Sequence, residues 1–345
     1  MWPSGFWHVP SRRSLPRRDP ETRLADRFRP PLPPARARGS PGNLVMAAAA
    51  HCHRSVQVSA DVRAVADAVA DKGESMVVNR YVALGDSFTE GVGDDDPSRP
   101  NGVRGWADRV AEQLAVGNPD FRYANLAIRG RLMDQVLDEQ LQPAIDLEPD
   151  LVTIYAGGND IMRKGIDIDA MIGRYDAALS RLRATGATVV VFTAYDTGWA
   201  PVFRLLRGRI AVYNELLREV AENRGLTVLD YWRLRGYDDM RMWSFDRLHM
   251  SPAGHARMAA EVLDVLGLPH AIDVPALGPA PTIDDATRRR EDREWVRSFL
   301  LPWFSRRIKG TSSGDGLTAK WPQPVGVEEF AGDTAAGDPA AAARS

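Results

Sequence analysis

The sequence contains a single cysteine, Cys52, among 345 residues, and this scarcity excludes an intramolecular disulfide and a multi-thiolate metal site. The fold must then be held by its apolar core, and a cytoplasmic location is favoured over secretion. The sequence also lacks any run of about 18 or more apolar residues, so no transmembrane helix is predicted. A formal net charge of −2 offers no basic excess that would attract a nucleic acid.

The two ends of the chain differ in composition from its middle. Residues 1–40 contain nine Arg, eight Pro and no Lys, a composition that buries too little apolar surface to offset the entropy lost on folding. We therefore expect residues 1–75 to form a disordered extension, and hypothesise that translation starts within it or at its end, at Met46 or Met76. Residues 332–345 have almost no large apolar side chain, and we expect residues 310–345 to form a disordered tail.

Between residues 79 and 270, short apolar runs alternate with longer segments of helical periodicity, which is typical of the α/β class. The runs are rich in Val, Ile, Leu and Tyr and predict five strands, at residues 80–84, 122–126, 151–155, 188–193 and 227–229. One helix is predicted to begin after the N-cap Ser251, with Pro252 as its first residue. Another carries an apolar stripe on one face, formed by Leu206, Ile210, Tyr213, Leu217 and Val220.

In an open parallel sheet, ligands bind beyond the carboxyl ends of the strands, so the residues that follow each strand are candidate site residues. Ser87 follows the first strand within Gly-Asp-Ser, Gly130 follows the second, and Asn159 follows the third within Gly-Asn-Asp. Asp246 lies three residues before His249 in the loop that precedes the last helix. Ser87 would lie at a helix N-terminus, where unpaired backbone N–H groups favour the negative charge that develops beside an acyl-transfer nucleophile. Each motif alone also fits an ordinary turn, and it is their joint order that is specific.

These four motifs, Gly85-Asp86-Ser87, Gly130, Gly158-Asn159-Asp160 and Asp246-x-x-His249, resemble the four sequence blocks of the SGNH/GDSL serine hydrolases, over residues 79–270. The resemblance implies a three-layer α/β/α sandwich with a five-stranded parallel sheet in flavodoxin-like order. It also implies hydrolysis of an ester or thioester without a cofactor or metal. By the same resemblance Ser87, Asp246 and His249 are the catalytic residues, and an oxyanion hole is formed by the backbone N–H groups of Ser87 and Gly130 and the Asn159 side chain.

Several interpretations stay open at this point. The substrate is a small-molecule, lipid or carbohydrate ester, and no pattern indicates the oligomeric state. An acyltransferase that uses the same triad is one alternative, and a binding module that has kept the fold and lost turnover is another. Asp86 and Asp160 are interpreted as structural residues of their turns. Arg129 either favours an anionic substrate or faces solvent.

Residues 283–309 repeat Trp295, Phe299 and Trp303 at helical spacing and predict a C-terminal amphipathic helix that Pro302 should kink or end. This helix docks on the hydrolase body, covers the acyl pocket, or lies on an anionic membrane surface. The aromatic residues of the preceding domain either line an apolar acyl pocket or belong to the core; they are Trp199, Phe203 and Trp243.

Three further motifs are interpreted as having no catalytic or metal-binding role. Residues 310–314 fit the G-x-S-x-G pattern of a nucleophile elbow, but no apolar strand precedes them and no histidine follows His270. His51-Cys52-His53 lacks the partners that would complete a zinc site. The acidic run at residues 94–96 is interpreted as an exposed loop and not as a calcium site.

Overall fold

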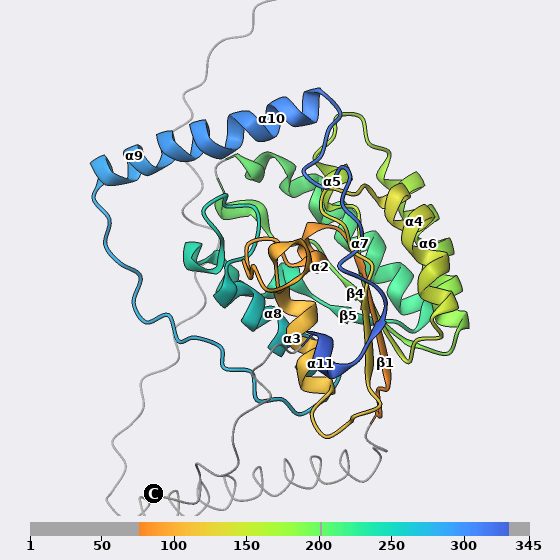
Figure 1. Cartoon of the computed structure of the whole chain (residues 1–345). Coiled ribbons are helices and arrows are strands. Elements are labelled where there is room, and N and C mark those ends of the chain that lie inside the picture. The colour runs from red at the N-terminus through yellow and green to blue at the C-terminus, as the bar shows by residue number, and fades with distance from the viewer. Residues whose placement is uncertain (1–75, 201, 331–345) are drawn as a thin grey trace, which may run out of the picture. The chain divides into compact units, whose positions relative to one another are not determined.

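The computed structural model describes residues 76–200 and 202–330 (Figure 1). The disordered extension expected at residues 1–75, the zinc motif within it, and the tail expected at residues 331–345 all lie outside the described residues. Among the residues that are described, no helix is both long and apolar enough to cross a lipid bilayer.

A six-stranded sheet in the order β5-β4-β3-β1-β2-β6 forms the centre of the fold. Its first five strands are parallel, and their bounds are β1 Arg80–Gly85, β2 Arg122–Asn125, β3 Leu151–Tyr155, β4 Thr188–Phe192 and β5 Thr227–Leu229. Their order is the flavodoxin-like one, so the predicted fold class is confirmed and the strand bounds are correct to within one residue. The predicted strand count is one too low, because β6 (Trp321–Val325) adds an antiparallel strand beside β2.

Helices cover both faces of the sheet and complete the predicted three-layer sandwich (Figure 1). One face is covered by α4 (Met133–Asp146), α6 (Ile168–Ala184) and α7 (Arg207–Arg224). The opposite face is covered by α3 (Gly105–Leu114) and α8 (Pro252–Val265). Both helices foreseen from the sequence are present, since α7 buries most of its apolar stripe and α8 begins at Pro252, where the Ser251 hydroxyl caps it.

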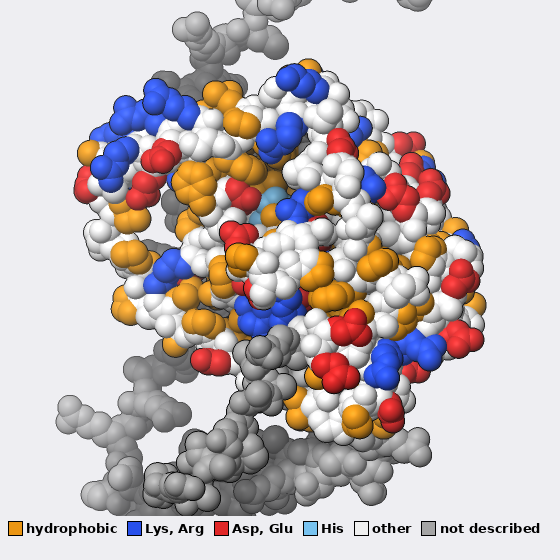
Figure 2. All heavy atoms as spheres, in the orientation of Figure 1, with side chains coloured by type: hydrophobic (Ala, Val, Ile, Leu, Met, Phe, Trp, Pro, Cys, Tyr) orange, Lys and Arg blue, Asp and Glu red, His pale blue; other side chains and the backbone are white. Residues whose placement is uncertain are grey.

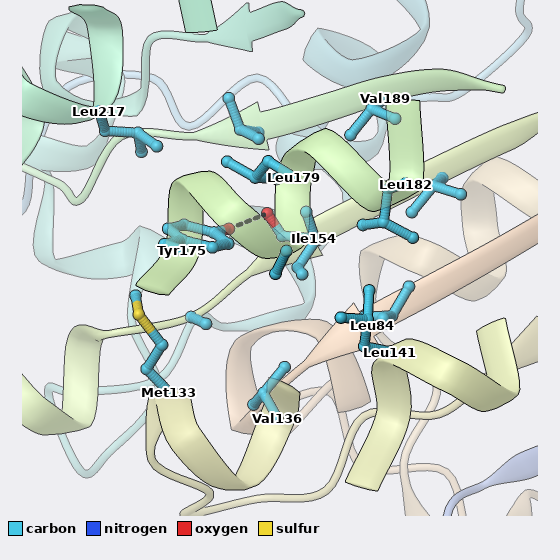
Figure 3. Packing of buried hydrophobic residues seen from close by; sticks show 14 of the residues in the cluster. Leu84, Met133, Val136, Leu141, Ile154, Tyr175, Leu179, Leu182, Val189 and Leu217 are labelled. Carbon is cyan, nitrogen blue, oxygen red and sulfur yellow. Dashed lines mark hydrogen bonds between the residues drawn. The ribbon is translucent and has the colours of Figure 1, made fainter. Parts of the chain in front are cut away.

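Successive side chains of a strand point to opposite faces, so each strand contributes to two core layers. In β1, Leu84 belongs to the layer under α4, α6 and α7, whereas Tyr81 belongs to the layer under α3 and α8. Figure 3 shows the first layer, in which strand side chains meet those of the surrounding helices. These layers fix the carboxyl ends of β1 and β3, where the candidate site residues follow.

The residues after 309 return to the sheet. β6 pairs with β2, and the short helix α11 (Val327–Phe330) places the buried Phe330 ring against Phe121 and Tyr123. The prediction of a disordered tail is therefore wrong for residues 310–330. The sequence does not predict this strand because it reads Trp-Pro-Gln-Pro-Val, and proline is tolerated only on an edge strand.

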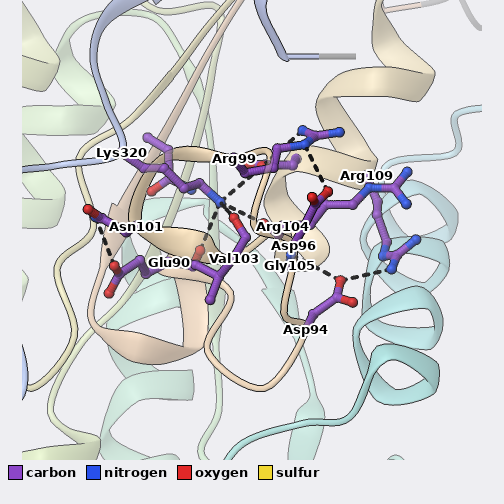
Figure 4. A network of polar contacts seen from close by, with 12 residues as sticks. Glu90, Asp94, Asp96, Arg99, Asn101, Val103, Arg104, Gly105, Arg109 and Lys320 are labelled. Carbon is purple, nitrogen blue, oxygen red and sulfur yellow. Dashed lines mark hydrogen bonds and ion pairs between the residues drawn. The ribbon is translucent and has the colours of Figure 1, made fainter. Parts of the chain in front are cut away.

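Lys320, just before β6, anchors this returning segment in a buried polar network (Figure 4). Its Nζ donates hydrogen bonds to the carbonyl oxygens of Glu90 (2.9 Å), Val103 (3.2 Å) and Arg104 (2.6 Å). It also lies 2.9 Å from Oδ2 of the buried Asp108. All donors of the ammonium group are thus satisfied by loop carbonyls and one carboxylate.

The C-terminal helix expected at residues 283–309 occurs in three parts. These are α9 (Asp285–Trp295), a π-helical turn (Val296–Leu300) and α10 (Leu301–Ile308). Pro302 does not end the helix. The preceding turn is widened, with the Leu301 N–H donating to the Val296 carbonyl, and such a π-turn accommodates a residue that lacks an N–H.

Candidate active site

Ser87 lies where β1 ends and the four-residue helix α2 (Ser87–Glu90) begins. Asp86 is the N-cap of this helix, and its Oδ1 accepts a hydrogen bond from the Phe88 N–H at 3.0 Å. The cap fixes Ser87 at the first helical position, where the backbone N–H has no acceptor within the helix. No acceptor for this N–H occurs elsewhere among residues 76–200 and 202–330 either, so it is available to an incoming anion.

The three residues predicted as catalytic are brought together, although Ser87 and His249 are 162 positions apart. His249 Nε2 lies 2.9 Å from Ser87 Oγ, and its Nδ1 lies 2.6 Å from Asp246 Oδ2. A carboxylate can only accept, so Nδ1 carries the hydrogen and donates it. In the neutral imidazole Nε2 is then the acceptor of the Ser87 hydroxyl, which is the arrangement that general-base catalysis requires.

Asp246 is fixed by the turn to which it belongs. Its Oδ1 accepts hydrogen bonds from the Ser244 hydroxyl (2.7 Å) and from the N–H groups of Leu248 and His249 (2.9 Å each). Arg247 adopts a φ of +56°, which tightens the turn. Burial favours the neutral acid, but the neighbouring His249 and these hydrogen bonds outweigh it and hold the pKa of Asp246 well below its usual range. Asp246 is therefore a carboxylate at neutral pH.

Gly130 lies on the loop between β2 and α4 with a φ of +80°, a conformation that few residues other than glycine adopt. A Cβ at this position would lie 1.9 Å from the Ser312 Oγ, so a larger residue would also displace Ser312. No hydrogen-bond acceptor for the Gly130 N–H occurs in the described part of the chain. The two backbone donors predicted for the oxyanion hole are thus both available, and both residues border the same pocket.

Asn159 lies in the short helix α5 (Gly158–Ile161), which follows β3. Its Nδ2 donates to Asp86 Oδ2 at 3.0 Å and to the Arg131 carbonyl at 3.1 Å. Both amide hydrogens therefore have partners, and donation to an oxyanion requires one of these bonds to be shared or exchanged. Asp86 itself is buried, and this burial raises its pKa to about 7 against the hydrogen bonds that it accepts.

Arg129 forms a buried ion pair that no sequence pattern signals. Its Nε and Nη2 donate to the two carboxylate oxygens of the fully buried Glu90 at 2.9 and 2.8 Å, and its backbone N–H donates to the same carboxylate at 2.6 Å. The solvent-facing interpretation of Arg129 is therefore wrong, because its charge is paired with the buried Glu90, whereas a preference for an anionic substrate stays a prediction. The pair holds the Gly130 loop against α2. Asp160 is also structural, but it caps α4 through the Met133 N–H (2.9 Å) instead of its own turn.

Two pockets meet at Ser87 and His249. The first is apolar, and its wall includes Tyr155, Ile161, Ala194, Phe203, Leu206, Ile210 and Trp243. Two of the three aromatic residues considered for an acyl pocket thus line it, while the side chain of Trp199 lies outside the described structure. The second pocket is polar and borders Gly130; its wall includes Arg129, Arg131, Arg163, Phe299, Trp303, Arg306, Ser312 and Asp315.

The C-terminal helix docks on the loop that carries the triad, as the first of its three interpretations predicted. The Trp295 Nε1 donates to the Asp246 carbonyl at 2.8 Å, and the Arg247 guanidinium lies 5.1 Å from the centre of the Trp295 ring and pairs with Asp292. Further along, Phe299 and Trp303 border the polar pocket and not the apolar one. The helix therefore supports the triad loop and forms part of the site.

Two of the rejected motifs have structural roles. The Ser312 hydroxyl donates to the Arg129 carbonyl at 3.2 Å, so the former nucleophile-elbow candidate packs against the Gly130 loop. The prediction of an exposed acidic loop is wrong for Asp94, which is buried and accepts hydrogen bonds from the Gly105 N–H and Arg109. Across the described residues, no cluster of three or more His, Cys, Asp or Glu side chains could hold a metal ion.

Comparison with known proteins gives a family match. The family model described as GDSL-like lipase/acylhydrolase matches residues 83–257, just over half of the chain. No curated protein matches. Similar solved structures include LAE5, an alpha/beta hydrolase from the metagenome of Lake Arreo, Spain, with 23% identity and a TM-score of 0.47 over 55% of this chain and 95% of that one.

Two other similar structures are TesA, with 23% identity and a TM-score of 0.45 over 54% of this chain and 97% of that one, and Axe2, an acetylxylan esterase from Geobacillus stearothermophilus, with 20% identity and a TM-score of 0.44 over 56% and 98%. The family match spans β1 to α8, and therefore includes every residue of the hydrogen-bonded series from Ser87 to Asp246. The chain thus belongs to the GDSL-like lipase/acylhydrolase family and is an ester hydrolase of the SGNH type.

Proposed function

We propose that this protein cleaves a carboxylic ester or thioester through an acyl-enzyme on Ser87. The observation that supports this most directly is the hydrogen-bonded series from the Ser87 Oγ through His249 to Asp246 at the junction of an apolar and a polar pocket. Ser87 Oγ attacks the acyl carbon while His249 Nε2 takes the hydroxyl proton. The bond to the leaving group then breaks as His249 returns that proton to it, and a water molecule repeats the sequence to release the acid.

The negative charge that develops on the acyl oxygen is stabilised by donors that are already in place. These are the available N–H groups of Ser87 and Gly130, and such preorganised donors cost no rearrangement at the moment of reaction. Asn159 is the third donor in this proposal. It contributes by turning toward the oxyanion the N–H that the Arg131 carbonyl accepts in the free protein.

In this proposal the acyl chain occupies the apolar pocket. Its wall carries few polar groups, and an alkyl chain gains about 0.8 kcal/mol for each methylene that it buries. The rate should therefore rise with acyl length until the chain fills the pocket, whose wall includes the aromatic side chains of Phe203 and Trp243.

The test is hydrolysis of p-nitrophenyl esters from acetate to decanoate by the full chain. Ser87→Ala and His249→Ala should each lower kcat by about 10⁴-fold or more, as removal of a nucleophile or base does in triad enzymes. Ser180→Ala on α6 is the matched control, because Ser180 borders neither pocket. An active Ser87→Ala protein would overturn the assignment of the nucleophile.

Two additional readouts separate the alternatives. Failure of Ser87 to react with a fluorophosphonate probe would indicate a binding module that has lost turnover, because the probe labels only a serine that its general base activates. Transfer of the acyl group to an added alcohol in preference to water would indicate an acyltransferase, because the acyl-enzyme does not dictate its acceptor.

A further inference from the structure

The polar pocket beside Ser87 has a composition that neither the fold nor the triad requires. Four arginines border it: Arg129, Arg131, Arg163 and Arg306. It shares Ser87, Asn159 and His249 with the apolar pocket and adds the oxyanion residue Gly130. Figure 2 shows a hollow on this face, beneath the helix formed by α9 and α10, with a histidine side chain inside it and Lys or Arg side chains beside it.

The four arginines fall into two groups. Arg129 is neutralised by the buried Glu90, and Arg131 pairs with Glu139 at 2.7 Å. For Arg163 and Arg306, no ion pair with an acidic side chain exists within residues 76–200 and 202–330. Burial raises the pKa of Asp160, and the charge of Arg163 opposes this at a distance, but the two side chains form no ion pair. The Asp160 carboxylate accepts a hydrogen bond from the Met133 N–H.

The acidic side chains on the same wall are already occupied. Asp246 is held by His249 and its own turn. Asp315 is exposed, and its Oδ2 accepts the Ser312 N–H at 2.8 Å. Arg163 and Arg306 therefore belong to the wall of this pocket without an ion pair to any carboxylate of residues 76–200 and 202–330, and the planar donor fork of arginine suits phosphate and carboxylate oxygens.

The position of these arginines identifies the part of the substrate that they contact. The acyl chain takes the apolar pocket, so the leaving group must extend to the other side of the Ser87–His249 pair, into the polar pocket. We propose that this pocket is a leaving-group subsite that selects esters whose alcohol part carries an anionic group, a phosphate or a carboxylate, bound by Arg163 and Arg306. This inference rests on the proposed function and narrows its substrate class.

The C-terminal segment is essential to this subsite. Arg306 lies on α10, which follows the residues matched by the family model, whereas Arg163 follows α5 within the family domain. The subsite is thus assembled from two segments that are over 140 positions apart, by a helix that the Trp295–Asp246 bond ties to the triad loop. Selectivity for the leaving group would then be a property of this chain that the family domain alone does not carry.

The test compares two esters that differ only by a phosphate, 1-acylglycerol 3-phosphate and 1-acylglycerol, with the acyl chain that the p-nitrophenyl series selects. We expect kcat/KM to be at least about tenfold higher for the phosphate ester, as one charge-assisted contact commonly provides. Arg163→Gln and Arg306→Gln should each reduce this ratio about threefold to tenfold, mainly through KM, and Arg306→Lys should restore part of it. Asp315→Asn should raise the ratio, because it removes a negative charge from the wall.

Arg183→Gln is the control, since this exposed arginine on α6 borders neither pocket and its loss should leave the ratio unchanged. Equal kcat/KM for the two esters, or the same ratio in wild type and both Gln variants, would overturn the subsite. The same kcat/KM ratio, measured with butyryl and with longer acyl chains, distinguishes two sources of the phosphate. A preference that requires a long acyl chain indicates a lipid headgroup, and a preference that is already present with butyryl indicates a small phosphate ester.

Direct binding separates this inference from the proposed function. Calorimetric titration with glycerol 3-phosphate, against glycerol, reports the subsite without any turnover. Binding that is lost in Arg163→Gln and Arg306→Gln, in a protein that hydrolyses no ester, would retain the subsite and overturn the proposed function. Hydrolysis of neutral esters with no binding of glycerol 3-phosphate would support the proposed function and overturn the subsite.

Discussion

Gly130 illustrates how much of the site depends on a single residue. Its φ is positive, and a Cβ added to it would lie 1.9 Å from the Ser312 Oγ and 2.9 Å from the Ser312 Cβ, so Ser312 or the loop would have to move. Its N–H is available as an oxyanion donor, whereas the carbonyl of the preceding Arg129 is held by Ser312. The backbone orientation of this loop is therefore set from outside the loop, by a residue of the C-terminal segment.

Gly130→Ala should displace this N–H and lower kcat by about 10²-fold to 10³-fold, the range seen when an oxyanion donor is lost. The measurement is steady-state hydrolysis of the preferred p-nitrophenyl ester. Gly117→Ala is the matched control, because it has a similar φ of +73° and open space around it, and so should cost stability without affecting kcat. The double variant Gly130→Ala/Ser312→Gly should recover part of the lost rate, and an unchanged kcat in Gly130→Ala would contradict this role.

The sequence predicts Asn159 as an oxyanion donor and Asp86 as a structural residue of its turn, but it does not predict the hydrogen bond between them. Their motifs follow different strands, and only the parallel pairing of β1 with β3 brings the two turns together. The oxyanion role of Asn159 remains a prediction, since both of its amide hydrogens have acceptors in the free protein.

Among the elements, β6 departs most from the prediction, because the local sequence indicates a disordered tail where the structure has a strand. A strand with two prolines carries no periodic apolar signal, and its place at the sheet edge depends on antiparallel pairing with β2. The segment is held by the buried Lys320 ammonium, which contacts Asp108 and three loop carbonyls. The same segment brings Ser312 to the Gly130 loop, so its docking affects the site.

Lys320→Met should lower the free energy of unfolding by about 3–5 kcal/mol, because it leaves the buried Asp108 with Arg99 as its one remaining cation and three buried backbone carbonyls without their donor. Urea unfolding measures this change. Lys309→Met, at the exposed end of α10, removes the same charge and should shift the free energy by no more than about 0.5 kcal/mol. A loss below about 1 kcal/mol for Lys320→Met would show that the returning segment does not depend on this anchor.

On the scale of the whole molecule, two buried groups make stability depend on pH in opposite directions. Burial lowers the pKa of His255 to about 4, while its Nδ1 accepts the Trp106 N–H at 3.1 Å and its Nε2 lies 3.2 Å from the Val92 carbonyl. Between about pH 4 and 6.5 the imidazole of His255 binds a proton more readily in the unfolded chain than in the folded protein. The contribution of His255 to the free energy of unfolding therefore rises with pH. Burial raises the pKa of Asp86 to about 7, so between about pH 4 and 7 the folded state holds the extra proton and the contribution of Asp86 falls as pH rises.

The free energy of unfolding, measured from pH 4.5 to 6.5 by urea titration at about half-unit steps, checks both signs. Relative to wild type, His255→Gln should make the slope more negative and Asp86→Asn should make it more positive, each by up to about 1.4 kcal/mol per pH unit. Groups common to all three proteins cancel in these differences. Identical slopes in wild type and both variants would contradict the buried titrations.

The sequence by itself determined the five parallel strands, the α/β class and the candidate triad. Each strand and each helix stripe is a local pattern, and the order of chemically distinctive residues after the strands is specific once the parallel sheet is assumed. Tertiary structure alone decided the Arg129–Glu90 pair, the return of Lys320 to Asp108 and the place of Arg306 in the wall of a pocket that Ser87 also borders. Each of these contacts joins positions that are far apart along the chain, and a single charged side chain produces no periodic pattern that could predict it. Their energy comes from burial and pairing that exist only after the chain has folded.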